Sequence, residues 1–115
     1  MPLSGPTPLT IDENGRTIPE GYRHMVSDNV TVVTAGTKVN LATSYTEGKR
    51  LDITNPTSNS AAAYIGGSGV KNAAGGPKGT PILPNNTYTF YISDLSLVWA
   101  DADANGVVLT YNYFY

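Results

Sequence analysis

Short runs of β-branched and aromatic residues, each followed by a turn sequence, are the feature that most constrains this chain. Residues 29–34 are almost all Val and Thr, and residues 87–92 alternate apolar and polar side chains. Glycines and the pair Asn55-Pro56 interrupt these runs, and such residues favour turns over continued strand. About seven or eight short strands with no convincing long helix are typical of an all-β domain. We therefore expect residues 29–115 to form a single β-sandwich or jelly-roll-like domain.

The segment Asp94–Ala104 fits helical and strand spacing about equally well. The pair Asn105-Gly106 that follows it is the strongest short signal for a hairpin turn. This pair favours two antiparallel strands, Leu97–Asp101 and Val107–Tyr113, joined as a hairpin. A single turn of helix can precede the strand Leu97–Asp101.

Residues 1–28 differ in kind from the rest of the chain. They contain four prolines and three glycines, and their apolar residues follow no sustained period. Proline removes backbone donors and biases the residue before it toward extended geometry. We expect an extended N-terminal arm with a short strand at Arg16–Ile18, either as a disordered tail or as a segment ordered against a neighbouring subunit. The spaced apolar side chains favour the second alternative. The side chains expected at that interface are Leu9, Ile11, Ile18, Tyr22 and Met25.

The composition excludes several classes of partner and chemistry. Charged residues make up 14% of the sequence, against about 25% in an average globular domain. The net charge is −2 and the seven cations are scattered, so we expect no nucleic-acid partner, which would need clustered cations. The absence of cysteine excludes disulfides and thiolate chemistry. With neither a signal peptide nor a run of roughly 20 apolar residues, we expect no membrane partner and no export.

Two motifs invite a catalytic interpretation, and neither supports one. His24, the only histidine, lies in the arm, where nothing supplies the nucleophile and orienting carboxylate of a catalytic triad. The glycine-rich run Gly66–Lys71 lacks the spacing of a phosphate-binding loop, and the residues after it cannot start a helix. We expect a solvated or interface histidine, a surface loop and no enzymatic activity.

A third motif, Asp101-Ala-Asp-Ala-Asn-Gly106, matches the first half of a calcium-binding loop. The second half is missing, because position twelve is Asn112 in place of a glutamate. Asp101 and Asp103 also lie on one strand, so they do not face each other across a cleft as a glycosidase pair does. We expect Asp103–Gly106 to be the polar tip of a hairpin, with no catalytic residue, no cofactor and no metal.

The last strand ends in tyrosines. Alternation places Tyr111, Tyr113 and Tyr115 on one face, with Asn112 and Phe114 on the other. Three interpretations remain open for the tyrosine face: a central strand of the domain's own core, an interface with a neighbouring subunit, or an aromatic platform for sugars.

The order of these motifs carries a resemblance. The motifs are Val30-Thr-Val-Val-Thr-Ala-Gly-Thr37, Leu51-Asp-Ile-Thr54, Ala63-Tyr-Ile-Gly-Gly67, Gly79-Thr-Pro-Ile-Leu-Pro84, Val98-Trp-Ala-Asp-Ala-Asp103 and the tyrosine-rich end. Their order is similar to that in a group of small virion proteins of tailed bacteriophages, which resemble capsid decoration (cement) proteins. The resemblance covers about residues 28–115, leaves out the arm and brings no catalytic residues with it.

The resemblance implies a non-enzymatic β-sandwich or jelly-roll subunit, often trimeric, on the exterior of the virion. Its partners would be the major capsid protein and copies of itself, and its role would be to stabilise the head. It would be made in the host cytoplasm. Two alternatives remain: a protein of the tail, fibre or neck, and a carbohydrate-binding module that uses Tyr88, Tyr91, Trp99 or the terminal tyrosines.

Overall fold

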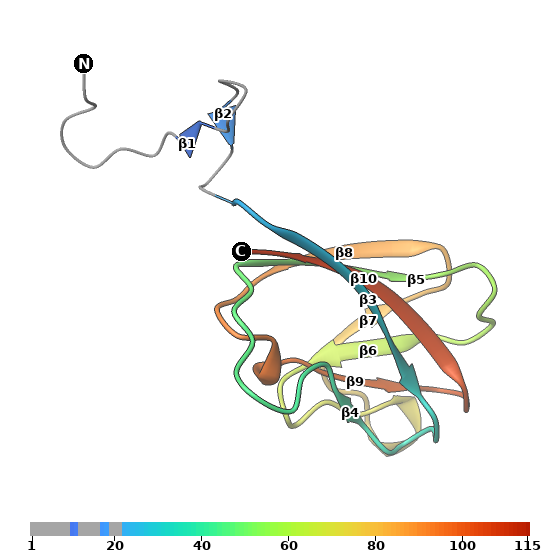
Figure 1. Ribbon diagram of the computed structural model, residues 1–115. Coiled ribbons are helices and arrows are strands. Elements are labelled where there is room, and N and C mark those ends of the chain that lie inside the picture. The colour runs from blue at the N-terminus through green and yellow to red at the C-terminus, as the bar shows by residue number, and fades with distance from the viewer. Residues whose placement is uncertain (1–9, 12–16, 19–21) are drawn as a thin grey trace.

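The computed structural model describes residues 10–11, 17–18 and 22–115, and its main feature is a pair of four-stranded antiparallel sheets (Figure 1). The first sheet has the order β3-β10-β5-β8, and the second has the order β4-β9-β6-β7. The first sheet consists of β3 (Met25–Val32), β10 (Val107–Phe114), β5 (Arg50–Asn55) and β8 (Asn86–Tyr91). The second consists of β4 (Val39–Asn40), β9 (Trp99–Ala102), β6 (Ala63–Gly66) and β7 (Thr80–Ile82).

No α-helix occurs among these residues, which contain only the short 3-10 turns η2 (Ala73–Gly75) and η3 (Leu95–Leu97). The all-β prediction is confirmed. The described part of the chain also holds no helix long and apolar enough to cross a membrane.

The strands pair in a nested order. Strand β3 pairs with β10, β4 with β9, β5 with β8 and β6 with β7, so each early strand meets a correspondingly late one. The pairs β10–β5 and β9–β6 then join these ribbons into the two sheets. Most hydrogen bonds between strands therefore connect segments that are far apart in the sequence.

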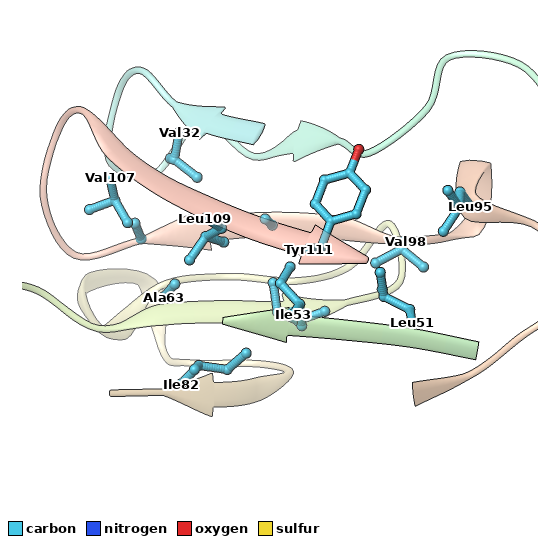
Figure 2. Close-up of a cluster of buried hydrophobic side chains, with 13 residues drawn as sticks. Val32, Leu51, Ile53, Ala63, Ile82, Leu95, Val98, Val107, Leu109 and Tyr111 are labelled. Atoms are coloured by element: carbon cyan, nitrogen blue, oxygen red, sulfur yellow. The ribbon is translucent and has the colours of Figure 1, made fainter. Parts of the chain in front are cut away.

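The core lies between the two sheets and follows from side-chain alternation. In β5, Leu51 and Ile53 are fully buried while the residues beside them face outward. In β10, Leu109 and its inward-facing neighbours supply bulky side chains in the same way (Figure 2). Strands β6 and β9 contribute the fully buried alanines Ala63 and Ala100, whose small side chains leave room for the branched ones opposite.

The prediction of a hairpin between β9 and β10 is wrong. Gly106 does occupy a turn, with φ at +75°, but β9 and β10 belong to different sheets. Both strands place apolar side chains in the same core, so they lie face to face rather than edge to edge. The turn is anchored to the end of β3 instead, since the Gly106 amide donates to the carbonyl of Val32 at 2.9 Å.

The single helical turn expected before this region is present as η3. Its N-cap is Asp94, whose carboxylate accepts hydrogen bonds from the amides of Ser96 at 2.9 Å and Thr46 at 3.0 Å. The hydrogen bond from the Thr46 amide, followed by one from the Ser96 hydroxyl, holds the pKa of Asp94 below its usual value. The cap thereby fixes the loop that precedes β5 to the start of η3.

Strand β3 of the first sheet begins at Met25. Residues 25–28, which we expected in the arm, therefore belong to this strand. Just before it, the amides of Arg23 and His24 both donate to the carbonyl of Tyr115. In the arm, β1 (Thr10–Ile11) pairs with β2 (Thr17–Ile18), which agrees with the short strand expected at Arg16–Ile18. Figure 1 draws this pair apart from the two sheets.

Replacing Leu109 tests whether β10 carries the core. We expect Leu109→Ala to lower the free energy of unfolding by about 2–5 kcal/mol, because it removes a fully buried branched side chain and leaves a cavity. The control is Val108→Ala on the outward face of the same strand, where the side chain is 37% exposed and the loss should stay below about 1 kcal/mol. Urea denaturation measures both. Equal losses would contradict this assignment of the inward face.

Candidate partner-binding face

The outer face of sheet β3-β10-β5-β8 carries a strip of partly exposed side chains at one end. Strand register aligns Met25, Phe114, Arg50 and Tyr91 across the four strands. The Arg50 guanidinium lies 5.3 Å from the centre of the Phe114 ring, and the centre of the Tyr22 ring lies 5.8 Å from that of the Phe114 ring. We call these five residues the strip. Its two outer members are open to solvent, Met25 at 64% and Tyr91 at 66%.

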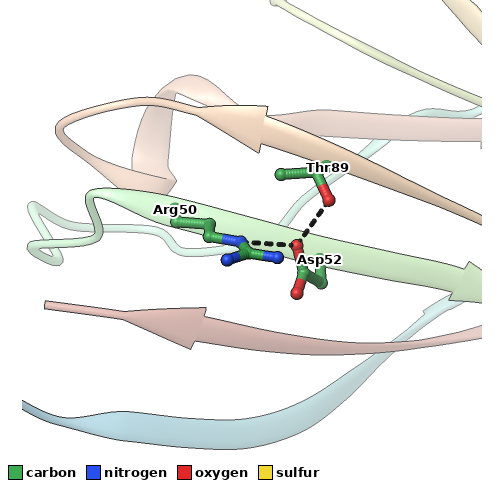
Figure 3. Close-up of polar contacts among 3 residues, drawn as sticks. All are labelled: Arg50, Asp52 and Thr89. Carbon is green, nitrogen blue, oxygen red and sulfur yellow. Dashed lines mark hydrogen bonds and ion pairs between the residues drawn. The ribbon is translucent and has the colours of Figure 1, made fainter. Parts of the chain in front are cut away.

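A polar row crosses the sheet directly beside the strip. Thr89 donates to a carboxylate oxygen of Asp52 at 2.7 Å, and the Nε of Arg50 donates to the same oxygen at 3.1 Å (Figure 3). The hydrogen bond to Asp52 raises the pKa of Arg50 and holds the guanidinium beside the Phe114 ring. At the other end of the same row, the Ser27 hydroxyl donates to the side-chain oxygen of Asn112.

A second polar row follows, in which the hydroxyls of Thr54 and Thr87 are hydrogen-bonded at 2.6 Å. A shallow groove of about 510 Å³ runs over the two polar rows. Its lining consists of hydroxyl, amide and carboxylate groups together with part of Tyr111. The face therefore combines hydrogen-bonding groups with a neighbouring apolar and aromatic strip, a mixture typical of protein–protein contacts.

The terminal tyrosines face inward, away from this surface. Tyr111 is 5% exposed and belongs to the core, which confirms the interpretation of a central core strand for this residue. Tyr113 packs against the same core, with its ring 6.2 Å from that of Tyr115. Tyr115 is half-buried and stacks on His24 at 4.8 Å. The aromatic residue that β10 presents outward is Phe114.

The residues expected at a partner interface are thus spread over different environments. Leu9 lies outside the described residues, and Ile11 and Ile18 lie in β1 and β2. Tyr22 and Met25 lie in the strip. Arg50 and Phe114 were not expected at an interface, and Tyr91 was named only for sugar binding, because the three come together only through the register of strands distant in sequence. The alternation that separates Phe114 from the tyrosines was the one available signal.

The calcium-like sequence forms an internal latch. Both oxygens of the Asp101 carboxylate, which is 2% exposed, accept backbone hydrogen bonds. Oδ1 accepts from Gly36 at 2.9 Å and Ala102 at 2.8 Å, and Oδ2 accepts from Asn72 at 3.0 Å. A buried carboxylate needs such partners to offset its lost hydration. Asp101 therefore joins two loops from opposite sides of β9.

The neighbouring Asp103 makes a related but exposed contact. Its carboxylate accepts from the amide of Ala73 and from the hydroxyl of Tyr64, each at 2.9 Å. Burial raises the pKa of Tyr64, and the hydrogen bond to Asp103 raises it further. Among the described residues, no three His, Asp or Glu side chains gather as a potential metal site.

Comparison of the chain with family models, with curated proteins and with solved structures finds no match.

Removing the latch should destabilise the protein. We expect Asp101→Ala to cost about 2–4 kcal/mol, since it leaves the buried amide of Asn72 and the partly buried amide of Gly36 without an acceptor. Asp103→Ala removes an exposed carboxylate with two contacts and should cost about 1 kcal/mol. Chemical denaturation compares the two variants, and an equal cost would argue against a special role for Asp101.

Tyr111 should make the protein sensitive to alkali. Burial raises its pKa from 10.0 to about 12, and the nearby Asp28 carboxylate acts in the same direction. Since folding holds the phenol neutral, its contribution is fully present below pH 10 and is lost as the pH rises through about 12. The free energy of unfolding should therefore fall less steeply over this range in Tyr111→Phe than in the parent protein. Tyr45→Phe, at a side chain that is 70% exposed, should follow the parent.

Proposed function

We propose that this chain is a non-enzymatic structural subunit of a tailed-bacteriophage virion, a decoration protein that binds the major capsid protein on the outside of the head and stabilises it. The observation that carries the proposal is the strip. Met25 and Tyr91 expose apolar and aromatic surface on either side of an ordered Arg50–Phe114 stack. Aromatic side chains, Met and Arg are the types enriched where protein surfaces meet.

The position of the strip supports the same function. It includes the first residue of β3, the strand into which the N-terminal arm leads. An arm and a strip that begin at the same corner can contact one partner continuously. The partners we propose are the major capsid protein and further copies of this chain, arranged as a homotrimer.

The nested strand pairing supports a finer description of the fold. We infer a jelly roll, because folding a long ribbon over itself pairs the first strand with the last and the second with the one before it. Jelly rolls are common in viral capsid domains and in lectins. Since one fold hosts many functions, this analogy adds to the strip and does not replace it.

The polar rows beside the strip suit a binding surface that is used many times on one particle. Hydroxyl and amide groups form a wet, hydrogen-bonded contact of modest strength. On a shell with many equivalent positions, weak contacts to neighbouring subunits add up through multivalency. The low charge of the chain keeps repulsion between adjacent copies small.

The strip can be tested by mixing the purified protein with virus heads that lack it. We expect Met25→Ser and Tyr91→Ser each to weaken co-sedimentation with heads by about tenfold or more, as is usual for exposed anchor residues. The matched control is Tyr45→Ser, because Tyr45 is as exposed as Tyr91 but lies outside the strip. Circular dichroism checks that all three variants fold.

Two results would overturn the proposal. Heads that bind the Tyr91 and Met25 variants as well as the parent would exclude the strip as the contact. Cryo-electron microscopy that finds the protein in a few copies at the tail or neck, with none on the head, would replace the decoration role by the tail alternative.

A further inference from the structure

A second groove lies on the outer face of the other sheet, where Trp99 is flanked by two loops. Its volume is about 600 Å³. One wall is formed by residues 36–38 and the other by residues 68–71, with the Trp99 indole between them. Cross-strand pairing sets Trp99 opposite Gly66, which has no side chain to cover the indole. The indole is partly exposed in this groove.

The groove is positively charged in a chain that is acidic as a whole. The Nζ of Lys38 lies 5.5 Å from the centre of the Trp99 ring, and Lys71 lines the opposite wall. Lys78 lies beside Lys71, since their backbones exchange hydrogen bonds at 3.0 and 3.1 Å. No acidic side chain lines the groove. The one ion pair in the described part of the chain joins Arg50 to Asp52, so these lysines have no carboxylate partner there.

Hydrogen bonds to the buried Asp101 carboxylate hold both walls of the groove in place. The Asp101 latch bonds the amide of Gly36 in the first wall and that of Asn72 directly after the second. Asp101 lies two residues after Trp99 in β9, and its two oxygens already accept three backbone hydrogen bonds. These bonds partly compensate its negative charge, and the carboxylate itself does not line the groove. A site whose walls are fixed before binding loses little entropy on binding.

We infer that this groove binds a saccharide that carries carboxylate or sulfate groups. The apolar face of a sugar ring packs on an indole, while a few polar groups fix its orientation. Lys38 and Lys71 are placed to bind an anionic substituent of a sugar that lies against Trp99. Lys38 and Lys71, with Lys78 beside Lys71, suit a short ligand that carries a few anionic groups. A polynucleotide would need a longer run of cations to neutralise successive phosphates.

The groove is on the sheet opposite to the strip, so this inference does not rest on the proposed function. Trp99 was one of the aromatic residues that the sequence named for sugar binding. Of the others, Tyr111 is buried and Tyr91 belongs to the strip. What the sequence did not predict is the charge, because Lys38, Lys71 and Lys78 are dispersed along the chain.

Trp99 is the only tryptophan, so its fluorescence reports directly on the groove. Titration of the full chain with tetragalacturonate, which carries carboxylates, and with a heparin tetrasaccharide, which carries sulfates, should change the emission to saturation in at least one case. The acidic sugar that binds more tightly identifies the preferred anionic group. Maltotetraose, a neutral sugar of the same length, should bind at least about tenfold more weakly. Added salt should weaken the binding of the acidic sugar.

Substitutions then locate the binding. Lys38→Gln and Lys71→Gln should each weaken binding of the acidic sugar by about tenfold. Lys49→Gln, at an exposed lysine that does not line the groove, should leave the affinity unchanged. Calorimetry gives the affinities independently of the fluorescence. No saturable change with either acidic sugar, or equal binding of maltotetraose, would overturn the inference. Tighter binding of a ten-residue deoxythymidine oligonucleotide would replace it by a nucleic-acid site.

Discussion

The first sheet depends on strand β10, which is hydrogen-bonded along both of its edges. Strand β3 pairs with it over its whole length on one side, and β5 pairs with it on the other. Without β10, the strands β3 and β5 would have no connection. The same strand carries inward-facing Leu109 and Tyr111 into the core and outward-facing Phe114 into the strip. Its two-residue alternation therefore sets both the interior and the binding face.

Local patterns in the sequence were sufficient for what local geometry decides. Alternation in residues 107–115 correctly separated the tyrosines from Phe114, and the single helical turn expected in this region is present as η3. The pair Asn105-Gly106 correctly marked a turn, yet it could not show which strand comes next to β10 in a sheet. That choice is made by the core, where β9 and β10 both bury apolar side chains and so face each other across it.

The candidate sites were less predictable, because both are assembled from distant segments. Tyr22 and Met25 were expected at an interface, but their neighbours Arg50 and Tyr91 join them only through strand register. Asp101 was expected at the end of a strand in an exposed hairpin, where acidic residues are usually solvated. Two loops instead supply enough amides to bury it. A sequence pattern holds no information on which distant amides will reach a carboxylate.

The nested pairing has a consequence for how this protein is made. Chains leave the ribosome from the N-terminus at about 5–20 residues per second. Strands β3 and β5 are synthesised early, but the strand that joins them is β10, at residues 107–114. Strand β3 therefore has no partner for most of translation, and β5 has none until β8 is made, so their backbone groups are open to other nascent strands until then. Polar residues make up half of β3 and four of the six residues of β5, which limits the apolar surface that these waiting segments expose.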